Sequence, residues 1–236
     1  MKAKAVAITQ SLVTDENGND LTPDQLIVYI ARVSNPNNQQ NHDTGPRLLE
    51  FCMKHGHWSV FEMADMTMEI ETSRAIAAQI LRHKIFSFQE FSQRYSDVSK
   101  LGDVMVEELE MWAKHVQGNR QGSGEDIGHR YSGGNLRTID AIAEEAVLTA
   151  LKNYHLLINN GVAPECARMI LPLATRTRLY MKGSVRSWIH YLMQRTTNHA
   201  QREHQLVAFE IEEQFEKHFP TVHAAMRLIQ VEQREI

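Results

Sequence analysis

Residues 63–95 read MADMTMEIETSRAIAAQILRHKIFSFQEFSQRY. Met66, Met68 and Ile70 alternate with polar residues, a period that is typical of a strand with one buried face. Ser73 follows this alternation and is a residue type that often caps a helix, so a helix is predicted over RAIAAQILRHK, residues 74–84. The stretch therefore predicts a half-buried strand that leads directly into a helix.

The end of the predicted helix is strongly polar. Gln79, Arg82 and His83 stand at i, i+3 and i+4, so their side chains share one helix face. From Arg82 to Tyr95, basic and hydroxyl groups are interleaved with apolar and aromatic ones. A solvated face would not need the apolar residues, and a core would not tolerate unpaired cations. The pattern indicates one wall of a pocket for an anion.

A plainer interpretation of the same segment stays open. In it, a charged helix end runs into an edge strand, and Arg82 and Arg94 form surface pairs with Glu90 or Asp97. Such exposed ion pairs contribute little stability. Planar guanidinium groups beside serine hydroxyls, by contrast, suit a phosphate ester.

The composition bounds the class of protein. The chain has 236 residues, 42% hydrophobic and 23% charged, as in ordinary globular proteins. A net charge of -4 argues against non-specific nucleic-acid binding, which usually needs an excess of basic residues. Two cysteines cannot make a disulfide framework, and no apolar run approaches a membrane span. We expect a soluble, cytoplasmic protein with no nucleic-acid and no membrane partner.

The remaining periodicities indicate an α+β protein. We expect strands at residues 2–9 and 173–183, and helices at residues 21–35, 44–57, 136–161, 164–172, 184–196 and 199–219. An acidic segment, 103–112, precedes a stretch rich in Gly, Ser and Asn, 117–135, which is expected to form a surface loop or a lid. No repeat and no linker is evident. The prediction is a single domain over residues 1–236, with helices packed on a small mixed or antiparallel sheet.

The segment HGHWSVFE, residues 55–62, concentrates polar groups before the central strand. It fits a helix end at which His55 complements the helix dipole and Ser59 begins a turn. A zinc site would need third and fourth ligands at suitable spacing, and the sequence offers none. No metal site is predicted.

Three arginines in the second half of the chain are further candidates. Arg168 is either an ion-pair partner of Glu165 or a clamp on a ligand. Arg186 and His190 stand at i and i+4, so they share one face of the predicted helix. Arg195, further along the same helix, is rotated from that face by about half a turn. The two arginines are either unrelated surface residues, or the helix lies between two sites or at a subunit interface that serves both.

Common nucleotide-binding motifs are missing. There is no G-x-x-x-x-G-K-[ST] motif. Gly122, Gly124 and Gly128 have the wrong last spacing for a dinucleotide fingerprint and do not follow a predicted strand. A Rossmann nucleotide domain is therefore not expected.

The sequence resembles the flavin-dependent thymidylate synthases. RHKIFSFQEFSQRYS is similar to their signature, Arg-His-Arg followed after seven residues by Ser and then by x-Arg-Tyr. Further segments follow the family's order: ARVSNP, HWSVFE, NRQGSGE, ECARMILPLATRT and RSWIHYLMQRTTNHAQREH. The resemblance covers roughly Ala31–Glu203, and five ordered segments are more specific than one motif.

This resemblance implies an activity, cofactors and an assembly. The family converts dUMP to dTMP with methylenetetrahydrofolate as carbon donor, bound FAD as hydride carrier and NADPH as reductant. It usually forms a homotetramer with sites between subunits, and its flavin site is not a Rossmann fold. The dUMP-binding residues implied by motif position are Gln79, Arg82, Glu90, Ser92, Gln93, Arg94, Arg168 and Arg195. The FAD-binding residues so implied are Ser34, His57, Ser59, Glu62, Arg82, His83, Lys84, Ile85, Arg186, His190 and His199.

The expected catalytic positions are Arg82, Ser92 and Arg195. Methylation at C5 of uracil needs electron density at that carbon, and a cation against a ring carbonyl stabilises the developing charge. Arg195 is the candidate for this cation. Arg94 and Ser92 are expected to hold the 5'-phosphate, with Ser92 binding rather than acting as a nucleophile.

Four positions depart from the family pattern. Lys84 stands where Arg is usual, which keeps the charge but loses the bidentate fork, so the affinity for FAD can differ. Met63 stands where His is common, Ser184 where Asn is frequent, and Gln93 where a small residue is usual.

Functions of three other classes remain as alternatives. A metal-dependent hydrolase could use some of the 12 histidines, although no pair has a convincing third ligand. A nucleic-acid-binding module could use Phe86, Phe88 and Phe91 as stacking platforms. A flavoprotein with lost or altered activity is compatible with Lys84 and Ser184.

Overall fold

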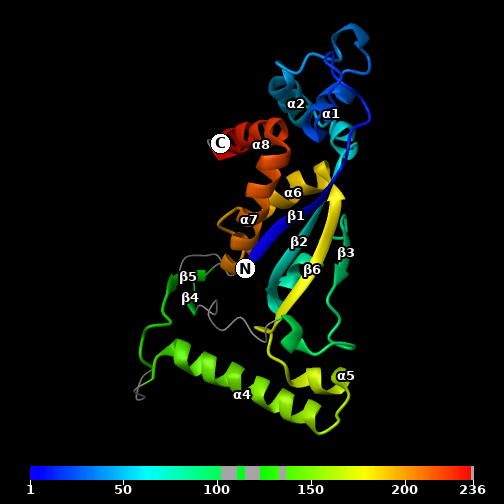
Figure 1. Cartoon of the computed structure of the whole chain (residues 1–236). Helices are drawn as coiled ribbons and strands as arrows, with labels where there is room; N and C mark the ends of the chain where they lie inside the picture. The colour runs from blue at the N-terminus through cyan, green and yellow to red at the C-terminus, as the bar shows by residue number, and fades with distance from the viewer. Residues whose placement is uncertain (102–110, 115–122, 133–136, 235–236) are drawn as a thin grey trace.

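The computed structural model describes residues 1–101, 111–114, 123–132 and 137–234. A four-stranded sheet runs through the middle of the molecule in the order β1 (Lys2–Ile8), β2 (Asp65–Ser73), β6 (Arg176–Ser184) and β3 (Ser87–Glu90) (Figure 1). All three neighbouring pairs are antiparallel. The predicted α+β class and its small antiparallel sheet are confirmed.

The two central strands, β2 and β6, build the core. They pair from Asp65 opposite Ser184 to Ser73 opposite Arg176. Alternate residues of β2 are buried, among them the three apolar residues that predicted the strand, and Leu179 on β6 is also fully buried. Because side chains alternate between the faces of a strand, this burial places one face of the sheet in the core.

Each central strand leads straight into a helix. Ser73 Oγ accepts a hydrogen bond from Ile76 N at the start of α3 (Arg74–Ile80), and Ser184 Oγ accepts one from Ser187 N at the start of α6 (Val185–Arg195). The predicted cap at Ser73 is confirmed. Because the two strands are antiparallel, the two helices begin at opposite ends of the sheet.

The predicted length of helix α3 is wrong. We expected it to run to residue 84, but α3 ends at Ile80 and a turn follows. The turn carries the chain back to the edge of β6 and places Phe86 in the core, 4.7 Å from the ring of Trp188. Burial of this ring removes apolar surface from water and stabilises the turn.

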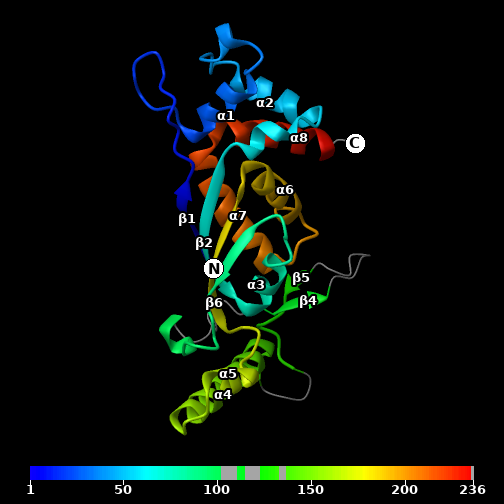
Figure 2. The same cartoon turned by 90° about the vertical axis from the view of Figure 1, so that its right-hand side faces the viewer.

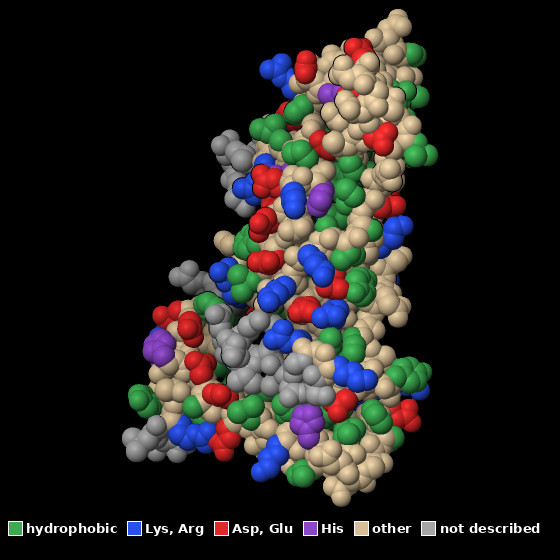
Figure 3. All heavy atoms as spheres, viewed as in Figure 1, with side chains coloured by type: hydrophobic (Ala, Val, Ile, Leu, Met, Phe, Trp, Pro, Cys, Tyr) green, Lys and Arg blue, Asp and Glu red, His purple; other side chains and the backbone are tan. Residues whose placement is uncertain are grey.

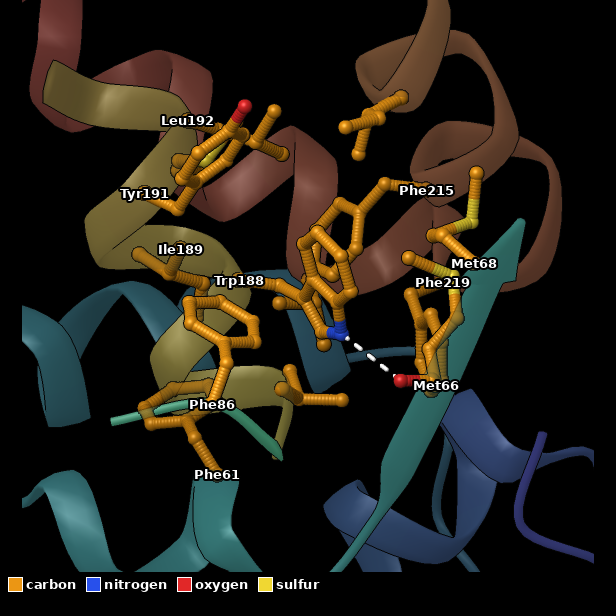
Figure 4. Close-up of a cluster of buried hydrophobic side chains, with 14 of the residues drawn as sticks. Phe61, Met66, Met68, Phe86, Trp188, Ile189, Tyr191, Leu192, Phe215 and Phe219 are labelled. Carbon is orange, nitrogen blue, oxygen red and sulfur yellow. Dashed lines mark hydrogen bonds between the residues drawn. The ribbon is translucent and has the colours of Figure 1, made fainter. Parts of the chain in front are cut away.

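Helices α6 and α7 (Arg202–His218) contribute Trp188, Tyr191 and Phe215 to the aromatic core. Trp188 is fully buried and its indole N–H donates to the carbonyl of Met66, 3.0 Å away (Figure 4). Phe61, Phe215 and Phe219 are buried in the same cluster. The sheet and its covering helices therefore share one hydrophobic core.

Further helices lie at the two ends of the sheet (Figure 2). At one end are α1 (Pro23–Ala31), α2 (Gly45–Lys54) and α8 (Pro220–Arg234), and at the other are α4 (Ile139–Asn159) and α5 (Pro164–Ala167). Short strands β4 (Trp112–Lys114) and β5 (Ser123–Asp126) form a second sheet. The 3-10 helices of the described residues are η1 (Pro36–Asn38), η2 (Trp58–Glu62), η3 (Val98–Leu101) and η5 (Arg168–Ile170).

Several of these elements were not predicted, among them β4, β5 and α8. Strand β5 lies within the stretch expected to be a loop, whereas residues 117–122 and 133–135 of that stretch and most of the acidic segment lie outside the described residues. Helix α8 begins just after the last predicted helix. Its N-terminus is capped by a distant residue, Asp24, whose carboxylate accepts from Thr221 N and Val222 N at 3.0 and 3.1 Å.

The surface carries both signs of charge. On the face shown in Figure 3, Lys and Arg side chains are interspersed with Asp and Glu. Among the described residues, no helix has both the length and the apolar composition that would let it cross a membrane.

Candidate active site

Two separate clefts flank helix α6. The first, of about 510 Å³, lies at the N-terminus of the helix, and we call it the α6 cleft; it is lined by Glu62, Asp65, Ile85, Ser87, Lys182, Gly183, Ser184, Arg186, Ser187 and His190. The second, of about 630 Å³, lies near its C-terminus, and we call it the Arg195 cleft; it is lined by Gln79, Arg82, His83, Gln194, Arg195, His199 and Gln201. Arg186 and Arg195 lie at opposite ends of α6 and line different clefts.

The α6 cleft has two cations near a helix N-terminus, each paired with a carboxylate of the same cleft. Arg186 forms an ion pair with Glu62 at 3.0 Å, and Lys182 lies 3.4 Å from Asp65. Both pairs are substantially exposed, so an incoming anion can compete for the cations at little cost. Backbone N–H groups at a helix start also favour anions.

His190 completes the floor of this cleft. Its ring lies 4.6 Å from that of Trp58, which packs beside it from η2. Burial and the nearby Arg186 lower the pKa of His190, against a smaller opposing effect of Glu62. His190 is therefore an uncharged polar group at neutral pH, available to hydrogen-bond with a planar ligand.

In the Arg195 cleft, the charged guanidinium of Arg195 is hydrogen-bonded to the neutral ring of His83. Arg195 Nε donates to His83 Nε2, 3.0 Å away. Burial and the charge of Arg195 lower the pKa of His83 to about 4. The neutral ring can accept at Nε2, which fixes the guanidinium through Nε and does not occupy its two terminal nitrogens.

Sequence reasoning missed two polar residues of the Arg195 cleft. Gln194 precedes Arg195 on α6, and Gln201 immediately precedes α7. Gln79 Nε2 donates to Gln201 Oε1 across the cleft. Both residues lie within the last segment that carried the family resemblance, so their proximity in sequence to Arg195 and His199 was the available signal.

The other predicted dUMP residues line neither cleft. Glu90 is ion-paired with Arg74 and accepts from Thr177 Oγ1 at 3.0 Å. The plainer interpretation expected Glu90 to pair with an arginine of the polar segment, and Arg74 takes that place. Gln93 is buried, and among the described residues its Nε2 atom has no hydrogen-bond partner.

Arg94 and Arg168 meet at the same acidic residue. Arg94 pairs with the carboxylate of Glu165 at 3.5 Å, and Arg168 Nε donates to the main-chain oxygen of Glu165 at 3.3 Å. The Oγ atom of Ser92 accepts from Arg94 N at 3.4 Å. These three candidates therefore form a group of their own beside α5.

The predicted FAD residues are distributed over three places. Glu62, Ile85, Arg186 and His190 line the α6 cleft, and Arg82, His83 and His199 line the Arg195 cleft. The rest line neither cleft. Ser34, Ser59 and Lys84 are exposed, and the exposed His57 stacks with Phe51, which also stacks with His55.

Metal ligation has no support in the described ranges. Within them, no three His, Cys, Asp or Glu side chains are grouped so that they could hold a metal ion. The two clefts instead offer guanidinium, amide, hydroxyl and imidazole groups, which are the partners of phosphates and of planar heterocycles.

The sequence is similar to proteins of known name along nearly its whole length. Residues 18–221 match the family model described as thymidylate synthase complementing protein. A flavin-dependent thymidylate synthase from Synechocystis sp. is 45% identical over 226 residues, which cover 96% of this chain and 99% of that protein. A probable flavin-dependent thymidylate synthase from Paramecium bursaria Chlorella virus 1 is 42% identical over 227 residues, with the same shares covered.

The fold also has a counterpart among solved structures. The crystal structure of a UMP/dUMP methylase from Streptomyces cacaoi, bound with 5-Br dUMP, matches with a TM-score of 0.70 and 24% identity, covering 96% of this chain and 94% of that one. At this identity the likeness shows the fold alone. The family match and the two relatives together establish that the chain belongs to the flavin-dependent thymidylate synthases.

Proposed function

We propose that this chain is an active thymidylate synthase that methylates dUMP at C5 to give dTMP. Methylenetetrahydrofolate is the proposed carbon donor, FAD the cofactor and NADPH the reductant. The names of the two relatives support the reaction, and the name of the methylase with a similar fold supports a uracil nucleotide as substrate. The single observation that carries the proposal is the Arg195–His83 pair in a cleft large enough for a nucleotide base.

The α6 cleft has a donor set that fits FAD. A diphosphate needs cations and N–H groups, which Arg186, Lys182 and the start of α6 provide. Ile85, which is 60% exposed at the edge of the cleft, offers apolar surface to a ring. When bound, FAD supplies the hydride that completes the methyl group, with NADPH as its source of reducing equivalents.

Arg195 is the proposed electrostatic catalyst. When C5 of uracil acts as the nucleophile, negative charge develops in the ring and on its carbonyl oxygens, and an oriented guanidinium stabilises that charge. His83 keeps the guanidinium oriented through Nε without adding a second charge, because its own pKa is depressed. The two residues thus hold one fixed cation against the base.

The phosphate of dUMP is assigned to the group beside α5. Arg94 and Arg168 are the proposed charged partners, and Ser92 and Gln93 supply hydrogen-bond donors. Neither cleft of a single chain contains these residues. We infer that a second copy brings them to the Arg195 cleft in a homotetramer, whose subunits each form one domain over residues 1–236.

A cytoplasmic location belongs to the same proposal. Both cysteines are free thiols, with Cys52 buried and Cys166 exposed. Free thiols are the normal state in a reducing compartment.

The reaction is tested by following dTMP formation from dUMP with purified protein. The complete mixture contains FAD, NADPH and methylenetetrahydrofolate, and each is omitted in turn. We expect product only in the complete mixture. A protein that holds FAD tightly and oxidises NADPH but forms no dTMP would instead be a flavoprotein of another activity.

A further inference from the structure

A buried hydrogen-bonded chain runs from the hydrophobic core to the Arg195 cleft. Tyr191 on α6 lies in the aromatic cluster (Figure 4), and its hydroxyl is 3.0 Å from His204 Nε2. His204 Nδ1 is 3.2 Å from Gln79 Oε1, and Gln79 Nε2 donates to Gln201. Both Tyr191 and His204 are fully buried, whereas Gln79 and Gln201 line the cleft.

The donors and acceptors of this chain can be ordered in one direction. An amide oxygen only accepts, so the His204 Nδ1 that faces Gln79 Oε1 must carry the proton. The neutral ring then accepts at Nε2, and the hydroxyl of Tyr191 must donate to it. Each group in the series determines the role of the next.

The environment keeps both buried groups in these roles. Burial, with Arg195 and His83 nearby, lowers the pKa of His204 to about 3, so its ring is neutral. Burial also raises the pKa of the Tyr191 hydroxyl, which therefore retains its proton as a donor. A protonated His204 would donate at both nitrogens and would lose the hydrogen bond from Tyr191.

We propose that Tyr191 and His204 are positioning residues that hold the Gln79 amide with its N–H side toward the nucleotide. This inference rests on the proposed function, because it assigns a role in binding dUMP. With Oε1 accepting from His204 and one N–H of Nε2 donating to Gln201, Gln79 has its second N–H left for a ligand in the cleft. A carbonyl or phosphate oxygen of dUMP can accept from this N–H, whereas a donor group on another ligand would be poorly matched to it.

Two substitutions of the same histidine separate this role from a general loss of packing. His204→Asn places an amide N–H near the position of Nδ1 and can still donate to Gln79. In His204→Gln the amide lies instead near the position of Nε2. Its oxygen can accept from Tyr191, but it has no N–H near the position of Nδ1 to donate to Gln79. Each variant gives up one of the two hydrogen bonds, so we expect similar losses of thermal stability.

The binding of dUMP to the FAD-loaded enzyme is then measured by calorimetry, together with KM and kcat. We expect His204→Gln to raise the Kd and KM for dUMP about tenfold, with the KM for the folate unchanged, and His204→Asn to stay within about threefold. Equal dUMP affinities in two folded variants, or the reverse order, would overturn the inference.

Tyr191→Phe provides a variant that conserves the volume of the core. It removes only the hydroxyl, so His204 loses the donor that determines its tautomer. A rise of about threefold in the Kd for dUMP is expected. An unchanged Kd in this variant would also contradict the proposed role of the Tyr191–His204–Gln79 hydrogen bonds. If the unmodified FAD-loaded enzyme binds no dUMP, the proposed function itself fails, which is a different outcome from equal affinities among variants.

Discussion

Arg195 and Ser92 both belong to the predicted nucleotide site, but the structure gives them different surroundings. Arg195 is fixed by His83 inside a cleft, whereas Ser92 is hydrogen-bonded to the main chain beside the α5 group. We therefore assign electrostatic catalysis to Arg195 and phosphate binding to Ser92.

Arg195→Ala and Ser92→Ala test this division of roles. The arginine variant should lose nearly all turnover at saturating dUMP, because the charge is needed most in the transition state. The serine variant should keep measurable kcat and show a raised KM, as expected when a ground-state binding contact is lost. Steady-state kinetics at saturating FAD distinguishes them, and an equal collapse of kcat in both variants would contradict the assignment.

Two neutral histidines near Arg195 make the stability of the protein sensitive to acid. The pKa is about 4 for His83 and about 3 for His204, below the value of about 6.5 in an unfolded chain. Between these values the unfolded state binds more protons than the folded state. Stability should therefore fall as the pH is lowered from about 6.5 toward 4.

His204→Asn isolates the contribution of the buried ring. The comparison with the parent cancels other titrations, including that of Asp24, whose raised pKa works in the opposite direction. Urea unfolding at pH 7 and at pH 5 should show that the parent's advantage shrinks by about 2 kcal/mol at the lower pH. The same advantage at both pH values would show that His204 is not held neutral.

At the scale of elements, local signals predicted starts better than ends. The alternation in β2 and the cap at Ser73 depend on neighbouring residues, and both are confirmed. The end of α3 depends instead on where Phe86 packs, against residues about a hundred positions later. Helix α8 is capped by Asp24, almost two hundred residues earlier in the chain. No local pattern carries such information.

Gly183 on β6 shows how closely the turn after α3 packs on the sheet. A Cβ atom at this position would lie 2.4 Å from Cδ1 of Phe86 and 3.2 Å from Cβ of Ser187. Gly183→Ala should therefore lower the free energy of unfolding by about 1–3 kcal/mol through overpacking. Urea unfolding measures this loss.

A second substitution checks that the loss comes from this contact. In Gly183→Ala combined with Phe86→Leu, the smaller side chain leaves room for the new methyl group. The double variant should lose less stability than the sum of the two single losses. Additive losses would place the cause elsewhere than the Gly183–Phe86 contact.

For the whole molecule, sequence motifs identified candidate residues but not their grouping. Arg186 and Arg195 line different clefts, an arrangement that helical periodicity allowed but did not decide. Periodicity could not reveal that Arg94 pairs with Glu165 beside Arg168, because that ion pair joins segments far apart in sequence. It could not find Tyr191 and His204 either, since both look like ordinary core positions.

Shared sites between copies can be tested by mixing two inactive variants. At dUMP concentrations well below the raised KM of Arg168→Ala, Arg195→Ala and Arg168→Ala should each show almost no activity alone. If each site takes Arg195 from one subunit and Arg168 from another, random mixed tetramers should have both arginines in about a quarter of their sites. Refolding or subunit exchange of the mixture should then restore activity, whereas no restoration would place both arginines in the site of one subunit.

Release of tritium from dUMP labelled at C5 tests the central claim most directly, since only substitution at that carbon frees the label. The measurement uses FAD-loaded protein with NADPH and methylenetetrahydrofolate, and runs the parent beside Arg195→Ala. We predict release by the parent that requires the flavin, the reductant and the folate, and almost none by the variant. Absence of release from parent protein that visibly holds FAD would contradict the assignment as a thymidylate synthase.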